Sequence, residues 1–276
     1  MNDERFLRAC QLRDDGHLRE AVDEFHRIAN DTEDPIDKAG VLVNAATTLK
    51  ALGEFDQARR QLSVAQSLIK SSDDSCIESG RDERLLQLEV MIEFDDADIS
   101  SYEGKIEEAL AKFDLILEKY GRRLKEPELQ ESYEMIQSRR GFILADLGRN
   151  KEALPIMEEA ESFEGRKAEI RFYLGHCYLA GRDYTRAAGK LLEALRLGLP
   201  QNLEYRAHCE MGIAYYNLKD YAHAKLEFEK SAETAGAEYI QRAQIWKWLE
   251  NTSRILGLKD KADRYSRLAS GADVTS

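Results

Sequence analysis

Residues 174–195, LGHCYLAGRDYTRAAGKLLEAL, decide the fold, because their apolar side chains follow the period of two short helices joined by a tight turn. The face shared along the first helix consists of Leu174, Gly175 and Tyr178. The face shared along the second consists of Tyr184, Ala187, Leu191 and Ala194. Small residues at Gly175 and Ala187 let two backbones approach closely, while the aromatic residues fill the space around them. We therefore expect a closely packed helical hairpin here.

The turn of this hairpin recurs along the whole chain as a motif in which an alanine follows a glycine or polar residue by five positions. The seven motifs begin at Gly16, Gly53, Gly104, Gly148, Arg182, Lys219 and Gly257. Their alanines are Ala21, Ala58, Ala109, Ala153, Ala187, Ala224 and Ala262. Another packing residue follows each alanine after four or seven positions, which is the spacing of one buried helical stripe. One such match is weak evidence, whereas seven indicate a repeat.

The order of small and large apolar residues resembles the tetratricopeptide repeat (TPR), whose period is about 34 residues. Four of the six spacings between the motif alanines lie between 34 and 38 residues. The resemblance implies an all-α, right-handed superhelical TPR solenoid of about seven helix–turn–helix repeats. We expect one solenoid over residues 2–270 and a frayed tail at 271–276. The expected hairpins are 2–34, 35–70, 82–120, 127–164, 166–198, 203–236 and 238–269.

The third and fourth hairpins carry the extra length. A polar loop, residues 71–80, precedes the third, and a long helix is predicted from Asp82 to about Tyr102. Residues 121–126, GRRLKE, break the pattern before the fourth, and Pro127 suits the first turn of a helix. We expect overlong helices in both hairpins.

Composition limits the class of partner. The chain has 276 residues, 43% of them hydrophobic, and only four prolines, which indicates an ordered protein. A formal charge of −12 argues against nucleic-acid and membrane partners, because both need a basic surface. The first residues, MNDERFLRAC, lack the apolar core of a signal peptide, so we expect a cytoplasmic location. Cys10, Cys76, Cys177 and Cys209 then fit reduced thiols better than disulfides.

Motifs for chemistry are missing from the sequence. No phosphate-binding loop, HExxH, CxxC or G-x-S-x-G is present. The pairs His176-Cys177 and His208-Cys209 have the atoms that bind zinc. However, the side chains of adjacent helical residues point about 100° apart. The histidine and the cysteine of each pair should therefore face different sides of the helix, one toward the surface of the hairpin stack and one toward its interior. We expect neither a cofactor nor a metal, and no enzymatic activity.

The TPR resemblance implies that the first helices of the hairpins line a concave groove that contacts ligands. The candidate groove residues are Asn44, Asp95, Asp98, Arg139, Phe172, Tyr173, His176, Arg206, Cys209, Tyr216, Lys247, Trp248, Asn251 and Arg254. The aromatic members suit a peptide or helix, although aromatic residues at helical spacing are also typical of a core. A carboxylate clamp of the chaperone-binding type is disfavoured, because Phe6 and Cys10 occupy its first positions. Lys247 and Asn251 reproduce that pair only in the last hairpin.

Charge is unevenly distributed along the chain. Residues 82–118 contain twelve acidic and three basic side chains, whereas residues 239–268 contain seven basic and three acidic ones. Both segments can be solvated faces. The functional alternative is an acidic middle that attracts a basic partner segment in a salt-sensitive association. Self-association between acidic and basic ends is also open.

The sequence therefore favours a non-catalytic interaction scaffold that binds a peptide or helix of a partner protein in the groove. One alternative is a regulatory sensor, in which a ligand changes the curvature of the solenoid and so controls another protein. An enzyme or metal protein built on the His-Cys pairs is a third.

Overall fold

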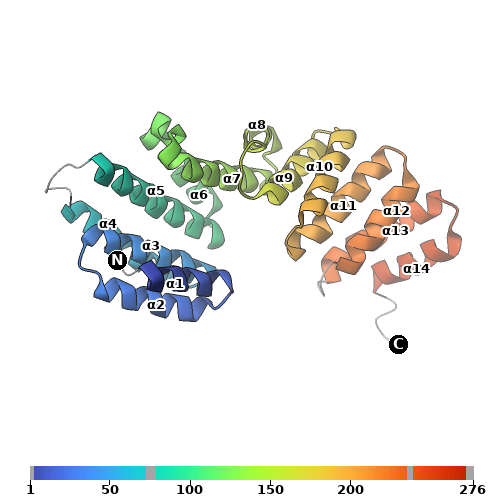
Figure 1. Cartoon of the computed structure of the whole chain (residues 1–276). Helices are drawn as coiled ribbons and strands as arrows, with labels where there is room; N and C mark the ends of the chain where they lie inside the picture. Colours follow the sequence, from blue (N-terminus) through green and yellow to red (C-terminus); the bar gives the residue numbers. More distant parts are fainter. Residues whose placement is uncertain (1–2, 73–78, 235–238, 272–276) are drawn as a thin grey trace. The chain divides into compact units, whose positions relative to one another are not determined.

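The computed structural model describes residues 3–72, 79–234 and 239–271, and Figure 1 shows that they form an all-helical chain. Within these ranges there are fourteen α-helices, two short 3-10 helices and no strand. The first part contains α1 (Asp3–Asp14), α2 (Leu18–Asp31), α3 (Pro35–Ala51), α4 (Phe55–Ser72), α5 (Ser79–Tyr102), α6 (Ile106–Tyr120), η1 (Gly121–Lys125) and η2 (Pro127–Leu129). The second contains α7 (Gln130–Asp146), α8 (Asn150–Ala160), α9 (Lys167–Ala180), α10 (Tyr184–Leu197), α11 (Gln201–Asn217), α12 (Tyr221–Thr234), α13 (Tyr239–Ile255) and α14 (Lys259–Ser270).

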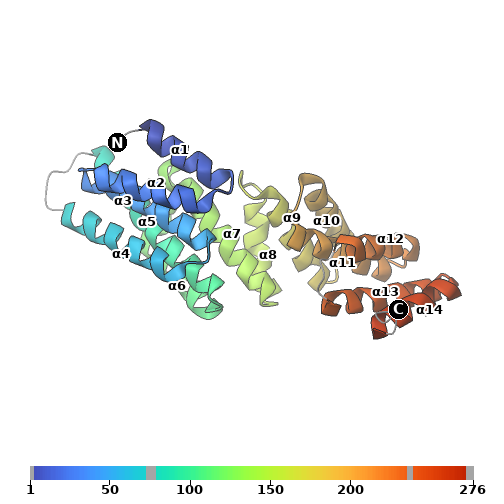
Figure 2. The same ribbon diagram turned by 90° about the horizontal axis from the view of Figure 1, so that it is seen from below.

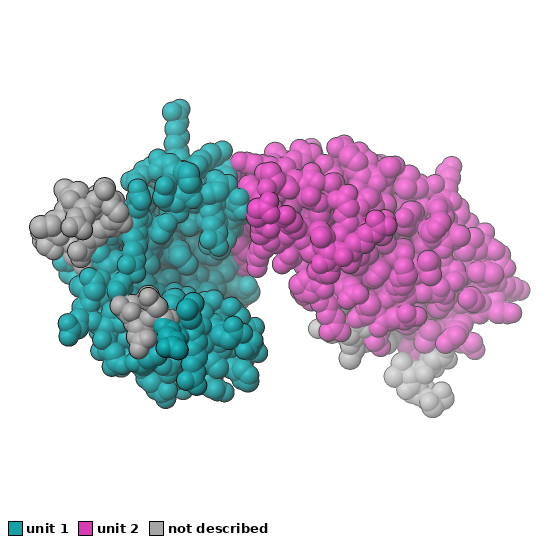
Figure 3. Space-filling model, in the orientation of Figure 1, with its two compact units in different colours: residues 1–136 teal, residues 137–276 magenta. Residues whose placement is uncertain are grey.

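The chain divides into two compact units, residues 1–136 and residues 137–276, and the boundary falls within α7 (Figure 3). In unit 1, α3 packs against both α2 and α4, and α5 packs against α6 (Figure 2). In unit 2, α9 packs against α10, α11 against α12, and α13 against α14. None of the described helices is both long and apolar enough to cross a membrane.

All seven predicted turns adopt the same backbone conformation. The first residue of each motif has a positive φ, between 63° at Arg182 and 83° at Gly16. The next residue donates its N–H to the carbonyl five positions earlier, as in His17 to Leu12 at 2.8 Å and Asp183 to Tyr178 at 2.9 Å. This bond is typical of the Schellman motif, which satisfies carbonyls at a helix end. Each of the seven motif positions therefore has the backbone geometry of a tight turn at a helix end.

The motif alanines lie where the two helices of a hairpin meet. Each of the seven is 0–1% exposed. In the fifth hairpin, Gly175 on α9 lies opposite Ala187 on α10. A Cβ on Gly175 would lie 2.6 Å from Leu191 Cγ and 3.2 Å from the carbonyl oxygen of Ala187, so a larger residue would not fit there. The predicted close approach of the helices containing Gly175 and Ala187 is therefore confirmed.

The extra length in the middle of the chain is distributed differently from the prediction. The third hairpin does contain a long helix, since α5 has 24 residues. The fourth does not, because α8 has only 11 residues, and the prediction of overlong helices there is wrong. Its additional residues form η1 and η2, which are anchored by the buried side chains of Leu124 and Leu129. Pro127 begins η2, ahead of α7.

Two further predictions involve residues outside the described ranges. Residues 73–78 of the predicted polar loop are among these, as are residues 272–276 of the predicted tail. Cys76 belongs to the first segment, whereas Cys10, Cys177 and Cys209 are free thiols.

Candidate functional site

A cavity in unit 2 lies between α11 and α13, the first helices of the last two hairpins. Its volume is about 290 Å³. The lining residues of α11 are Tyr205, Arg206, Cys209, Glu210 and Ile213, and those of α13 are Gln244, Ile245 and Trp248. The spacing of four residues between Cys209 and Ile213, and between Gln244 and Trp248, brings side chains to one face of a helix. Two helix faces thus meet over one cavity.

The polar side of the cavity is tied to neighbouring helices. His176 on α9 hydrogen bonds through Nδ1 to Glu210 Oε1 at 2.9 Å. Arg206 Nη2 donates to Asp146 Oδ1 on α7 at 3.2 Å, and Tyr173 OH donates to the other oxygen of Asp146 at 2.8 Å. These bonds cross from α11 to α9 and α7, so the polar groups are held in place by the fold.

The apolar side of the cavity is built on a group of aromatic rings. Trp248 stacks on Phe228 with centroids 5.6 Å apart and meets Tyr216 edge-on at 5.3 Å. On the polar side, the Arg206 guanidinium lies 5.1 Å from the centre of the Phe172 ring. Trp248 is half-buried, so part of its indole remains accessible beside the cavity.

Burial sets the protonation of several groups around this site. It raises the pKa of both the Cys177 and the Cys209 thiols to about 12, so neither is a thiolate at neutral pH. Burial lowers the pKa of His176, but the hydrogen bond and charge of Glu210 outweigh it and the net pKa is raised. Burial and the neighbouring Asp146 both raise the pKa of Tyr173.

The His-Cys pairs do not converge. His176 binds Glu210, while Cys177 lies 3.7 Å from Asn150. His208 points instead to Glu227, at 2.6 Å. Across the described ranges, no group of three or more His, Cys, Asp or Glu side chains is arranged to hold a metal.

In unit 1 the predicted groove carboxylates form a buried ion cluster. Lys50 Nζ lies 2.6 Å from Asp95 Oδ1 and 2.8 Å from Asp98 Oδ2. Thr47 donates a further hydrogen bond to Asp95 at 2.6 Å. The side chains of Asp95 and Asp98 are only 3% and 6% exposed. These carboxylates therefore join α3 to α5 and are not presented to a partner.

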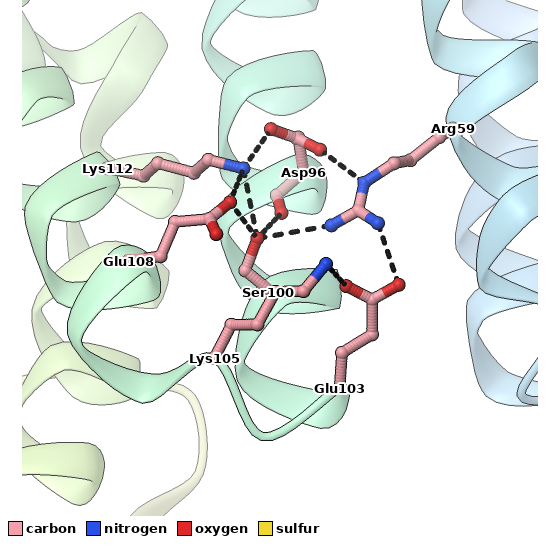
Figure 4. Close-up of polar contacts among 7 residues, drawn as sticks. All are labelled: Arg59, Asp96, Ser100, Glu103, Lys105, Glu108 and Lys112. Atoms are coloured by element: carbon pink, nitrogen blue, oxygen red, sulfur yellow. Dashed lines mark hydrogen bonds and ion pairs between the residues drawn. The ribbon is translucent and has the colours of Figure 1, made fainter.

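A second network neutralises further acidic residues of the same segment (Figure 4). Asp96 accepts from Arg59 Nε at 2.9 Å and from Lys112 Nζ at 2.6 Å. Arg59 also reaches Glu103 at 2.7 Å, and Lys112 reaches Glu108 at 2.9 Å. The network links α4, α5 and α6, so its carboxylates hold these helices together.

No protein-family model matches the chain. Cell division cycle protein 27 homolog A of Arabidopsis thaliana is 35% identical over 88 residues, which are 32% of this chain. The chain spans only 12% of that protein's length.

Solved structures match over most of their length. The C-terminal part of a TPR repeat-containing protein from Cytophaga hutchinsonii matches with a TM-score of 0.56 and 17% identity, covering 98% of this chain and 96% of that one. Pseudomonas aeruginosa PilF matches with a TM-score of 0.61 and 16% identity, covering 87% of this chain and 95% of that one. A tetratricopeptide repeat protein from Parabacteroides merdae gives a TM-score of 0.52 and 14% identity, covering 98% and 92%.

The chain has the tetratricopeptide repeat fold. Its all-helical architecture matches that of these neighbours, and the all-α TPR class expected from the sequence is confirmed. At these levels of identity the likeness shows the fold and not the partner.

Within this TPR fold, several predicted groove residues are near the cavity. Arg206, Cys209 and Trp248 line it, whereas His176 and Tyr216 contact its lining residues. Sequence reasoning missed Glu210 as a site residue. The signal was its position four residues after Arg206, which puts both on one face of α11.

Other predicted groove residues are buried or bonded within the TPR packing, and their role in binding stays a prediction. Phe172 is 0% exposed and Tyr173 is 6% exposed, because both pack inside unit 2. Asp95 and Asp98 are buried against Lys50. Asn44 is half-buried and hydrogen bonds to Gly40 and Arg13, at 3.0 and 3.1 Å.

The remaining predicted residues lie away from the cavity lining. Arg139 is half-buried on α7. Lys247, Asn251 and Arg254 are exposed on α13, where Arg254 pairs with Glu250 at 2.7 Å. None of these four lines the cavity of about 290 Å³.

Proposed function

We propose that this TPR chain is a non-catalytic adaptor that binds a peptide or helix of a partner protein at the cavity between α11 and α13. The observation that carries the proposal is the half-buried Trp248 beside a cavity of about 290 Å³ built from two adjacent first helices. Small-molecule sites are usually about 300–1,000 Å³. The cavity is thus suited to anchoring one side chain of a larger partner.

The rigidity of the site supports this proposal. Ion pairs and aromatic stacking already fix Arg206, Glu210 and Trp248 in the free chain. Binding therefore requires little ordering of the adaptor, and more of the contact energy remains as affinity. The protonated thiols of Cys177 and Cys209 are consistent with a site without covalent chemistry.

The proposal is tested by selecting binders from a displayed library of random peptides and measuring their affinities by fluorescence polarisation. Selected peptides should bind the unchanged chain, and Trp248→Ala should weaken them at least tenfold. Gln244→Arg, which places a larger side chain at an exposed position of the lining, should do the same. Leu226→Ala is the matched control, because Leu226 is 46% exposed on α12 and does not line the cavity.

Circular dichroism must show that each variant keeps its helical content. If the selected peptides bind both cavity variants as tightly as the control, the cavity is not the binding site. If no peptide is enriched over an unrelated helical protein, the adaptor proposal itself is rejected.

A further inference from the structure

We propose that the partner segment anchors itself in the α11–α13 cavity through a lysine side chain whose ammonium group binds Glu210. This inference rests on the adaptor function proposed above and identifies the chemistry of its partner. It starts from an unmet hydrogen-bonding requirement in the cavity wall.

Glu210 is a carboxylate with one engaged and one unengaged oxygen. Its side chain is 13% exposed, and Oε1 is held 2.9 Å from His176 Nδ1. Oε2 is buried and has no hydrogen-bond partner among the described residues. A buried polar atom without a partner destabilises the fold, and more so when it is charged. A ligand that reached this oxygen would recover that cost.

The ligand must be a donor, since a carboxylate oxygen only accepts hydrogen bonds. A cation is preferred, because hydrogen bonds between charged groups are about twice as strong as neutral ones. The basic group of the cavity does not meet this requirement. Arg206 is bound to Asp146 at 3.2 Å and lies over Phe172. The unengaged oxygen of Glu210 therefore favours a cationic side chain over an acidic one.

The number of available oxygens distinguishes lysine from arginine. An arginine fork binds a carboxylate best through two parallel bonds and needs both oxygens. His176 already occupies Oε1, which leaves one oxygen at Glu210. A lysine ammonium is a compact point charge that is satisfied by a single oxygen.

The apolar lining matches the rest of a lysine side chain. Ile213, Ile245 and Trp248 share the cavity with Glu210. A lysine buries its four-carbon stem along apolar surface while its charged end seeks a polar group. The accessible indole of Trp248 adds a favourable surface for a cation. The cavity thus offers apolar side chains for the lysine stem and the Glu210 carboxylate for its ammonium group.

The test uses two small probes, N-acetyl-lysine-N-methylamide and N-acetyl-norleucine-N-methylamide, which differ at the end of the stem by the ammonium group. Binding is followed through the indole N–H resonance of Trp248 in ¹⁵N-labelled protein. The chain has only two tryptophans, so Trp246→Phe assigns the signal. The lysine probe should shift the Trp248 resonance in a saturable way, and the norleucine probe should bind at least tenfold more weakly.

Glu210→Gln should weaken the lysine probe at least tenfold, because it removes the charge while keeping the shape. Glu233→Gln is the matched control, since Glu233 is an exposed carboxylate on α12 outside the cavity. The lysine anchor is overturned if the norleucine probe binds equally well, if Glu210→Gln keeps full affinity, or if no shift saturates. The comparison of probes on the unchanged chain needs no variant to fold.

The outcomes separate this inference from the adaptor proposal. Peptides selected at the cavity that need no lysine would reject the lysine anchor and leave the adaptor intact. Binding of the lysine probe without any selected peptide would support the cation site and reject the adaptor.

Discussion

Replacing Lys50 with methionine should destabilise unit 1 by about 3–5 kcal/mol, which is the usual cost of leaving a buried charge without its partner. Lys50 Nζ lies 2.6 Å from Asp95 and 2.8 Å from Asp98, and its side chain is only 11% exposed. Methionine keeps most of the apolar stem, so packing changes little. What is lost is the ammonium group that pairs with both buried carboxylates, which then repel each other more strongly.

The assay is urea unfolding followed by circular dichroism, combined with hydrogen exchange of the α3 and α5 amides. Both tryptophans, at positions 246 and 248, belong to unit 2, so their fluorescence does not report directly on α3 or α5. In Lys50→Met, exchange should increase in α3 and α5. Removing the two negative charges with Asp95→Asn and Asp98→Asn should recover much of the lost stability.

Lys105→Met is the matched control for the same chemical change at the surface. Lys105 pairs with Glu103 at 2.9 Å, but its side chain is 53% exposed. Exposed pairs contribute about 0–1 kcal/mol, so this variant should unfold almost like the unchanged chain. If Lys50→Met costs no more than Lys105→Met, the Lys50 cluster is not the stabilising element described here.

Three further predictions address the packing, the turns and the pH dependence. Gly175→Ala should cost about 1–2 kcal/mol in thermal unfolding, since its Cβ would lie 2.6 Å from a buried leucine. Gly141→Ala should cost less, because its Cβ would meet mainly the flexible end of Met157, although Ile156 Cγ2 also lies 3.2 Å away. Arg182→Gly and Lys219→Gly should each raise the free energy of unfolding by about 0.5–1 kcal/mol, because both residues have a positive φ. An unchanged midpoint of thermal unfolding in these variants would contradict backbone strain at the two positions. Burial raises the pKa of Glu227, but the hydrogen bonds and charges of His208 and Lys230 lower it by more. The net pKa of Glu227 is therefore below its usual value of 4.5. Its charged form therefore stabilises the fold above about pH 4.5, this contribution disappears as the pH falls through the folded-state pKa, and Glu227→Gln should flatten the acid limb of a stability–pH curve.

The elements determined by local sequence were predictable. Each turn depends on a residue that adopts a positive φ and on an alanine five positions later. Both can be recognised within a stretch of six residues of the sequence. Even Arg182 and Lys219, which lack the freedom of glycine, were located by the alanine that follows them.

The roles of charged residues were not predictable in the same way. The acidic stretch of α5 suggested a surface for a basic partner, yet Asp95 receives its countercharge from Lys50, 45 positions earlier. Pairing across helices depends on how neighbouring hairpins stack, which local composition does not reveal. The same limit applies to Phe172, which is fully buried and lies 5.1 Å from the guanidinium of Arg206 on the next hairpin.

The constant length of the seven turns has a consequence for how this chain tolerates insertions. The hairpins differ in length, but the motif alanine always follows the positive-φ residue by five positions. One residue added inside a turn would rotate the second helix by about 100° and move its alanine off the interface. Residues added between hairpins, such as those of η1 and η2, do not change how the two helices within a hairpin are rotated relative to each other. Insertions of foreign sequence should therefore be accepted between hairpins and rejected within their turns.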